Sequence, residues 1–404
     1  MERRRTESSK GNPILADLMI RGGRVFDPAQ RALGQQDIAI AKGRIVRIGD
    51  LADVVEASRV LDAAGMIVTP GLIDLHVHAF PLGQLIGVDV DPLSSRSGVT
   101  TFIDAGSTGA LNFLAFRRYV VERARSNLFA LLNVSAIGCC LHGLKGVEMW
   151  EGEIPALISL PAAIELIEGN RDIIIGVKVR LNTGLPTLAP LAAARELADT
   201  VSLPLVVHAV SPPPSFRDVL PYLRPGDVVT HIYHSGPGAI VNRSGRLCPE
   251  YQEARARGVL MDTGSAWMFT DFAVARVAIQ QGFVPDTISS DLTTLTLDRL
   301  TVDLPTTLSK FMALGLGLED VLVKATAAPA RFLPAGRGFG QLKEGAPADL
   351  AILALEEGEF EYRDKFGHQA GARKRLVSFT TVKDGQILEP SPNEVLPWKF
   401  LWRW

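Results

Sequence analysis

The sequence predicts an α/β protein: a (β/α)8 TIM barrel with a small β-sandwich domain built from both chain ends. Eight short apolar runs alternate with helical patterns between residues 70 and 339, an arrangement typical of parallel strands linked by helices. On either side of that region, short alternating runs punctuated by glycine indicate a small antiparallel sheet. The 404 residues are enough for one large and one small domain.

The two ends of the chain share the alternating pattern. It occupies 17–25 and 37–49 before the central region, and it returns at 348–353 and 377–385 after it. We therefore expect both ends to pair in one sandwich, with the barrel inserted between them. The predicted divisions are a flexible tail at 1–14, the β-sandwich domain at 15–69 plus 340–395, and the barrel at 70–339.

The central runs are mostly continuous and apolar, as expected of parallel strands that helices cover on both faces. Helical patterns between them include 111–124, 190–200 and 271–282. Such barrels carry their chemistry at the C-terminal ends of the strands. The stretch 136–171 is longer than one helix requires, so we expect an inserted loop there that leans over the site. His142, within this loop, is interpreted as incidental, although it could reach the mouth of the site. The predicted strands are 71–78, 99–105, 128–135, 172–180, 204–210, 227–232, 258–262 and 286–291.

Side chains of metal-ligand type stand at the ends of five of these runs. The first ends in His76-Val77-His78, and alternation along a strand places both imidazoles on one face. The fourth carries Lys178 and Arg180 on the inward face, where an unpaired ammonium group is costly. Reaction of Lys178 with CO2 would give an anionic carbamate; pairing with a carboxylate is the alternative. The other three runs end in His208, His231 and Asp291.

Taken together, these residues resemble the amidohydrolase superfamily, in its two-metal, dihydroorotase-like branch. Within that branch the chain is most similar to the deacetylase-like metallohydrolases. The resemblance covers nearly the whole chain, and the segments that support it most directly are 98–107, 178–180, 223–227 and 305–311.

The resemblance implies a role for each ligand-type residue. His76 and His78 would bind the more buried metal, and His208 and His231 the more exposed one. Carboxylated Lys178 would bridge both metals. Asp291 would touch the buried metal and handle the proton.

The implied cofactors are two divalent metal ions and the CO2-derived carbamate on Lys178. Imidazole and carboxylate ligands without thiolates suit zinc, with manganese and cobalt as alternatives. In the implied mechanism the exposed metal polarises a carbonyl, a metal-bridging hydroxide attacks it, and Asp291 moves the proton. The expected reaction is cleavage of an N-acyl or aryl amide, or of an ester. The alternatives are a cyclic amidase of the hydantoinase or dihydroorotase kind, and a non-catalytic scaffold.

Substrate contacts are expected from two strands and one loop. The Arg180 guanidinium would hold a substrate carboxylate in a bidentate pair, or it would form an ion pair with a barrel carboxylate such as Asp104. Asn133 would donate to the substrate or satisfy backbone groups. Trp267 and Met268 stand where the deacetylase-like relatives carry Gly-His-Gly, which suggests a larger or aromatic substrate, or ordinary loop packing.

Composition argues against several other classes of function. The net charge of −2 gives no electrostatic case for nucleic acid or an anionic membrane. No run is long enough for a membrane span, and the polar first residues contain no secretory signal. Cys139, Cys140 and Cys248 are expected to be reduced thiols, which favours a cytoplasmic location. The expected partner is a small-molecule substrate, and homo-oligomers are compatible with the sequence.

Overall fold

The computed structural model describes residues 13–390, except 143, 145–146, 148, 150, 182–186, 211, 267–268 and 298–301. Most of the predicted flexible tail, 1–14, lies outside the described residues, as do the last residues of the predicted sandwich, 391–395. Trp267 and Met268, two predicted substrate contacts, also lie outside them.

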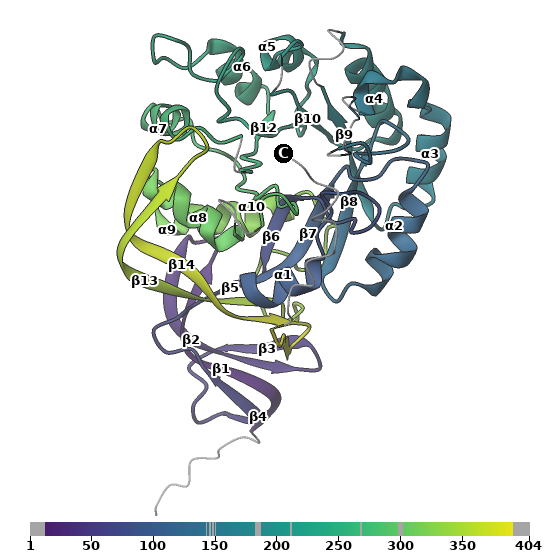
Figure 1. Cartoon of the computed structure of the whole chain (residues 1–404). Helices are drawn as coiled ribbons and strands as arrows, with labels where there is room; N and C mark the ends of the chain where they lie inside the picture. Colours follow the sequence, from purple (N-terminus) through teal and green to yellow (C-terminus); the bar gives the residue numbers. More distant parts are fainter. Residues whose placement is uncertain are drawn as a thin grey trace, which may run out of the picture.

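A parallel sheet that curls around its own axis forms the centre of the molecule (Figure 1). Its seven strands follow the order β12-β11-β10-β9-β8-β7-β6, and every neighbouring pair is parallel. The prediction of an α/β protein with a parallel central sheet is therefore confirmed. The strands are β6 (Leu72–Val77), β7 (Val99–Ala105), β8 (Asn127–Asn133), β9 (Ile174–Arg180), β10 (Leu205–His208), β11 (Val228–Val229) and β12 (Leu260–Met261).

The eighth predicted strand, 286–291, is not a regular strand. Isolated parallel bridges join Thr287 to Asp262 at one edge of the sheet and Leu292 to Val77 at the other, so this segment lies between the two edge strands. The Thr287 hydroxyl also donates to the Asp262 carboxylate at 2.7 Å. Side-chain hydrogen bonds of this kind compete with a regular backbone ladder, which explains the irregular geometry.

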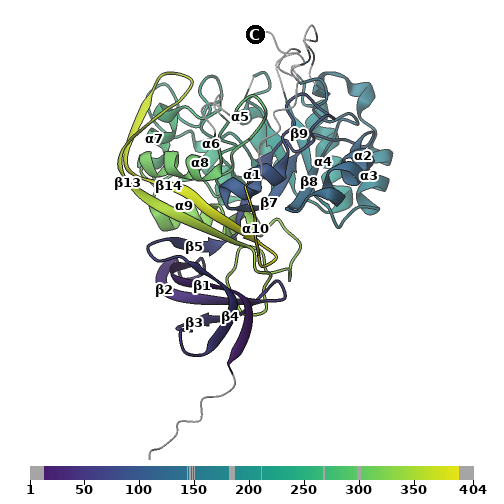
Figure 2. The ribbon, with the colours of Figure 1, turned by 60° about the horizontal axis from the view of Figure 1, so that its bottom comes forward.

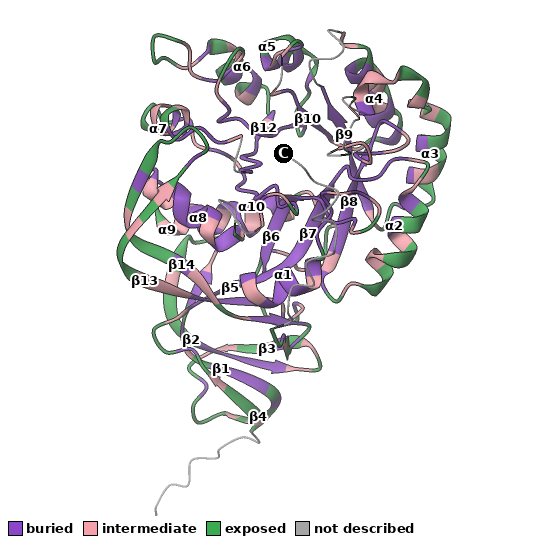
Figure 3. Ribbon diagram, viewed as in Figure 1, coloured by how far each residue is buried: buried purple, intermediate pink, exposed green. Residues whose placement is uncertain are grey.

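Helices pack outside the curled sheet, with their outer faces exposed and the strands buried (Figure 3). The pattern at 111–124 forms α2 (Phe113–Tyr119) and the short 3-10 turn η1 (Val121–Arg123), while those at 190–200 and 271–282 form α4 (Ala189–Val201) and α7 (Phe272–Gln280). Among the described residues, no helix combines the length and apolar character needed to cross a membrane. The other helices are α1 (Val90–Ser97), α3 (Leu160–Glu168), α5 (Phe216–Val219), α6 (Pro249–Ala256), α8 (Leu304–Ala313), α9 (Leu318–Lys324) and α10 (Ala327–Ala330), with 3-10 turns η2 (Glu151–Glu153), η3 (Pro155–Leu157) and η4 (Leu220–Tyr222).

Both ends of the described chain form one sheet, whose N-terminal strands lie below the curled sheet in Figure 2. Its order is β15-β14-β13-β5-β1-β2-β3, with β4 also paired to β1. Because β1 is parallel to both β4 and β5, the expected antiparallel sheet is in fact mixed. Its strands form a single hydrogen-bonded sheet. Alternation along a strand reports its buried face, but not the direction of its neighbour. The strands are β1 (Ile14–Asp27), β2 (Ala32–Ala41), β3 (Arg44–Gly49), β4 (Val55–Asp62), β5 (Ile67–Pro70), β13 (Leu350–Arg363), β14 (Gln369–Lys383) and β15 (Gln386–Ile387).

The hairpin of β13 and β14 is longer than the sequence pattern indicates, and it runs beside α8 and α7 in Figure 1. Leu376 N on β14 donates to Ser309 Oγ on α8 at 2.8 Å. Near the hairpin turn, Asp364 accepts from Phe272 N at the start of α7, also at 2.8 Å. The hairpin therefore fastens the terminal sheet to the helices around the central one.

Candidate metal centre

The predicted ligands converge at the carboxyl ends of the central strands. The ring centroids of His208 and His231 lie 4.4 Å apart, and those of His76 and His231 lie 5.1 Å apart. Asp291 Oδ1 lies 3.4 Å from His76 Nε2 and 3.6 Å from His78 Nε2. Segments far apart in the sequence thus place imidazoles and a carboxylate around one point.

Lys178 reaches the same place from the inward face of β9. It is only 2% exposed, and its Nζ donates to Ala105 O at 3.3 Å. Gly106 makes room for this side chain, because a Cβ there would lie 2.7 Å from Lys178 Cγ. A cavity of about 50 Å³ separates these groups, and its walls include His76, His78, Lys178, His208 and Asp291.

A hydrogen-bond chain fixes the orientation of His76. Its Nδ1 lies 3.1 Å from Thr230 Oγ1, and the Thr230 hydroxyl donates to Asp262 Oδ2 at 2.8 Å. Since that hydroxyl donates to the carboxylate, its oxygen accepts the proton on His76 Nδ1. His76 Nε2 is then unprotonated and faces Asp291, which is the state a metal ligand requires.

Two other imidazoles are held in the same way. His231 Nδ1 donates to Gly264 O at 2.7 Å. His78 Nδ1 lies 2.9 Å from Ser107 Oγ, and Ser107 is itself held in place by Gln84 Nε2, which donates to the same hydroxyl oxygen at 2.5 Å. In each case the outer nitrogen is occupied, which leaves Nε2 as the atom that can bind a cation.

Two buried atoms at this centre have no hydrogen-bond partner among the described residues: His231 Nε2 and Asp291 Oδ1. Leaving a buried polar atom unpaired costs roughly 1–3 kcal/mol. Donor atoms of His76, His231 and Asp291 all lie within 4.8 Å of one another. Imidazole and carboxylate donors suit zinc and similar divalent ions. The unpaired atoms and this donor chemistry together fit a divalent cation.

Two curated relatives resemble most of the chain, although no family model matches it. A deacetylase of Agrobacterium fabrum is 30% identical over 333 residues, which span 80% of this chain and 79% of the relative. A deacetylase of Brucella anthropi is 31% identical over 340 residues, which span 82% of each chain.

Two solved structures are also similar to this chain over most of its length. The crystal structure of an adenine deaminase superposes with a TM-score of 0.84 at 27% identity, covering 92% of this chain and 99% of the other. That of a dihydroorotase gives a TM-score of 0.82 at 28% identity, covering 93% and 99%. The chain belongs to the amidohydrolase superfamily. The resemblance noted in the sequence is confirmed, and the protein is an enzyme of this hydrolytic superfamily.

The backbone of this amidohydrolase is strained at two of the predicted ligands. His231 has φ of 63° and Asp291 has φ of 51°, in the left-handed region that residues other than glycine rarely adopt. Such strain concentrates at functional sites, where the surrounding structure holds it in place. The left-handed backbone of His231 also interrupts the extended conformation of the strand. As a result β11 ends at Val229, before the end of the predicted run 227–232.

Burial sets the charge of the imidazoles in the amidohydrolase. It lowers the pKa of His76, His78, His208 and His231 well below the ordinary histidine value, and neighbouring positive or imidazole groups lower it further. All four rings are therefore neutral near pH 7, the form in which histidine binds metals.

The lysine and the carboxylate are shifted toward their neutral forms as well. Burial lowers the pKa of Lys178, against the opposing effect of Cys139 and Asp291. Burial raises the pKa of Asp291 to about 7, although the Lys178 and Arg180 charges lower it. A lower pKa raises the fraction of neutral lysine amine, which is the form that reacts with CO2.

Arg180 forms an ion pair, but its partner is not Asp104. The guanidinium pairs with both carboxylate oxygens of Glu151, at 2.9 and 2.5 Å. Glu151 comes from η2, within the insertion predicted at 136–171. Asp104 instead accepts from the backbone N–H groups of Ala79 and Ser107, each at 2.8 Å. The carboxylate that pairs with Arg180 is thus supplied by a loop rather than by a barrel strand.

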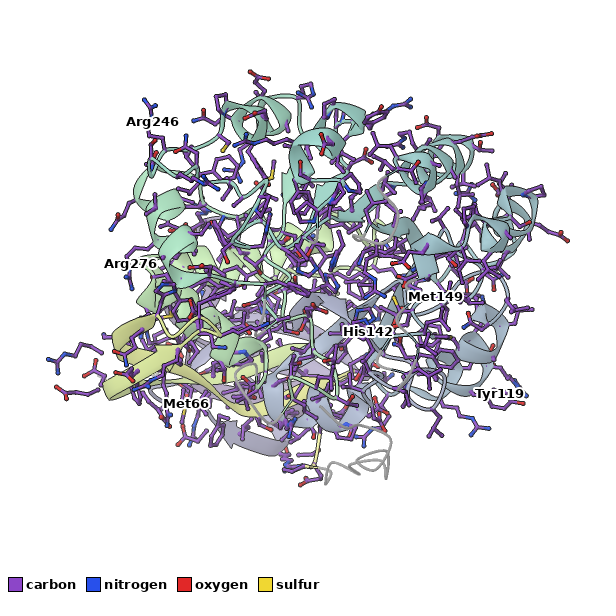
Figure 4. The ribbon with its side chains drawn as sticks, turned by 45° about the horizontal axis from the view of Figure 1, so that its top comes forward. Met66, Tyr119, His142, Met149, Arg246 and Arg276 are labelled. Carbon is purple, nitrogen blue, oxygen red and sulfur yellow. The ribbon has the colours of Figure 1, made fainter. Side chains whose placement is uncertain are left out.

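Other predicted contacts have different outcomes. Asn133 Nδ2 donates to Gly106 O at 3.1 Å and its Oδ1 accepts from Ser135 N at 3.0 Å, so it satisfies backbone groups. His142, near the middle of the view in Figure 4, lines the cavity wall. The ring of Phe269, just after the undescribed Trp267 and Met268, packs against that of His231 with centroids 4.5 Å apart.

A much larger cavity, of about 980 Å³, lies at the opposite ends of the same strands. Its walls include Ile174 at the start of β9 and Leu260 at the start of β12, and none of the predicted ligands. Arg195 and Asp227 also line it and pair with each other. In barrels of this kind the amino ends of the strands serve stability and the carboxyl ends serve catalysis, so the smaller cavity is the candidate active site.

The Thr230 hydroxyl allows a test of the hydrogen bonds that orient His76. We expect Thr230→Val, which keeps the side-chain shape, to lower zinc affinity by about 10–100-fold, the usual cost of losing a partner of a metal ligand. Zinc affinity is measured by competition with a chromogenic chelator.

Thr287→Val is the matched control, because the Thr287 hydroxyl also donates to Asp262 but touches none of the predicted ligands. It should leave zinc affinity within about threefold of wild type. Equal losses in the two variants would show that Asp262 acts through general stability and that Thr230 does not orient His76.

Proposed function

We propose that the protein is a two-metal hydrolase that cleaves the amide bond of a small N-acyl or aryl amide, or the corresponding ester. The observation that carries the proposal is the buried, unpaired donor set formed by His231 Nε2 and Asp291 Oδ1 beside three further imidazoles. The deacetylase relatives support an acyl amide as the substrate.

In this proposal His76 and His78 would hold one divalent cation and His208 and His231 a second, and a carbamate on Lys178 would supply a further anionic ligand. Zinc is the expected ion, and manganese or cobalt would also suit these donors. Bound divalent cations polarise a carbonyl and lower the pKa of a coordinated water to about 7. Asp291 Oδ1 accepts a proton and returns it to the leaving nitrogen or oxygen.

We also propose that the architecture is a complete (β/α)8 barrel. The segment 286–292 would take the eighth strand position, since it bridges Asp262 beyond β12 and Val77 of β6. This arrangement brings Asp291 between the first and seventh positions, which is where its contacts with His76 and His78 require it.

A cyclic amidase is the second candidate, favoured by the structural likeness to a dihydroorotase. The two functions differ in the substrates that the purified protein hydrolyses. N-acetyl amino acids, acetanilides and simple esters test the first, and hydantoin and dihydroorotate test the second. Turnover of the cyclic compounds alone would overturn the first proposal.

Metal removal is expected to abolish the amide hydrolysis. Dialysis against a strong chelator should lower the rate by at least about a hundredfold, because both proton transfer and carbonyl polarisation depend on the metal site. Adding zinc, manganese or cobalt should restore activity, as measured by product release. Full activity in a preparation shown by elemental analysis to lack metal would contradict the proposal.

A further inference from the structure

The guanidinium of Arg180 is already occupied by groups of the protein. Its Nε and Nη2 donate to the two oxygens of Glu151, and its Nη1 donates to His142 Nδ1 at 2.6 Å. Since the guanidinium can only donate, His142 Nδ1 accepts and the ring is neutral; burial and the Arg180 charge lower the pKa of His142 to about 3. All three guanidinium nitrogens thus have an acceptor.

The partner carboxylate is built into the interior. Glu151 is 1% exposed, and besides Arg180 it receives Asn133 Nδ2 and Cys139 Sγ, each at 3.4 Å. Burial alone would raise the pKa of Glu151, but the Arg180 charge, the hydrogen bonds from Arg180 and smaller effects together outweigh it and hold the pKa below its ordinary value. The pair is therefore a buried, ionised and multiply bonded unit, unlike an exposed ion pair of little energetic value.

The position of this pair connects it with the substrate. Arg180 lies two residues beyond Lys178 on the same face of β9, and both side chains line the cavity with His142 and Cys139. A guanidinium there would otherwise be the group that receives a carboxylate next to the scissile amide. Here the carboxylate of Glu151, from the insertion between β8 and β9, already accepts from that guanidinium.

We infer that Glu151 is a specificity-determining residue that excludes substrates with a carboxylate beside the scissile amide, so that the enzyme prefers amides uncharged at that end. This inference rests on the proposed function. A substrate carboxylate would have to approach Glu151 as a like charge, or displace it and leave a buried carboxylate unpaired. Both costs act as rejection of the charged substrate.

The experiment compares N-acetyl-L-alanine with N-acetyl-L-alaninamide. These two probes differ only in carrying a carboxylate or a neutral carboxamide beside the scissile amide. With the zinc-loaded protein, kcat/KM for the neutral amide should exceed that for the acid by at least about tenfold. In Glu151→Gln, which keeps the side-chain shape but removes the charge, this ratio should shrink by about tenfold or more, through a lower KM for the acid. Glu153→Gln, in the same turn η2, is the matched control and should keep the wild-type ratio.

Wild-type preference for the acid, or an unchanged ratio in Glu151→Gln, would overturn the inference. If Glu151→Gln does not fold, the double variant Glu151→Gln, Arg180→Gln, which removes both charges of the buried pair together, should also show a smaller ratio than wild type, because the like charge that opposes the acid is gone. If the probes bind without being hydrolysed, the ratio of their Kd values by calorimetry tests the inference, while the proposed function fails for this pair. Binding of neither probe would count against the inference as well.

Discussion

Replacing Lys178 with alanine is expected to lower the rate of amide hydrolysis by at least about a hundredfold, since loss of even an indirect partner of a metal ligand costs 10–100-fold. Lys178 is buried beside His76 and His78 in the cavity wall, and burial lowers its pKa toward the amine that combines with CO2. Removing it would delete the carbamate that we propose the two cations share. The measurement is kcat/KM together with metal content.

Short carboxylic acids such as acetate should restore part of the activity of Lys178→Ala, because a free carboxylate can occupy the space of the carbamate. Lys310→Ala is the control, since Lys310 is also buried but lies on α8, away from the cavity. It should affect stability without changing metal content. Wild-type rates in Lys178→Ala without added acid would exclude the proposed role of this lysine.

Replacing Asp291 with asparagine should lower kcat by about 10²–10⁴-fold, the usual contribution of general acid–base catalysis. Asparagine keeps the shape of the side chain but cannot take up the proton that the proposed mechanism assigns to Oδ1. That atom lies 3.4 Å from His76 Nε2 and has no hydrogen-bond partner among the described residues. The measurement is kcat on the best amide of the panel, normalised to bound metal.

Asp227→Asn serves as the control for loss of a buried aspartate. Asp227 lies at the opposite ends of the strands, where it accepts from Leu205 N at 2.8 Å. The folded fraction of that variant should retain wild-type kcat, even if its thermal stability falls. A kcat for Asp291→Asn within tenfold of wild type, at full metal content, would remove Asp291 from the proton transfer.

The sequence made the predicted ligand set recognisable because the ligands follow a simple rule. In a parallel barrel the carboxyl ends of all strands meet, so polar residues that end apolar runs must lie together. His208 illustrates this, as the last residue of β10. Arg180 follows the same rule at the end of β9. Such positions can be predicted without knowing the conformation of any loop.

Two residues that shape the site, Glu151 and Asp262, were missed. Glu151 lies in the insertion at 136–171, where no strand or helix pattern fixes its position, so its pairing with Arg180 depended on tertiary structure. Asp262 did end a predicted strand, and that signal was available, but its role depends on the hydroxyls of Thr230 and Thr287. Strand direction in the terminal sheet was missed for a different reason, because alternation is the same in parallel and antiparallel pairs.

Diffraction from crystals grown with zinc, recorded at the zinc absorption edge, tests the central claim most directly. The account predicts two anomalous peaks in the small cavity, at about 2.0–2.2 Å from nitrogen or oxygen donors of the four histidines, the Lys178 carbamate and Asp291. A cavity without a peak, or peaks with Lys178 and Asp291 turned away from them, would contradict it.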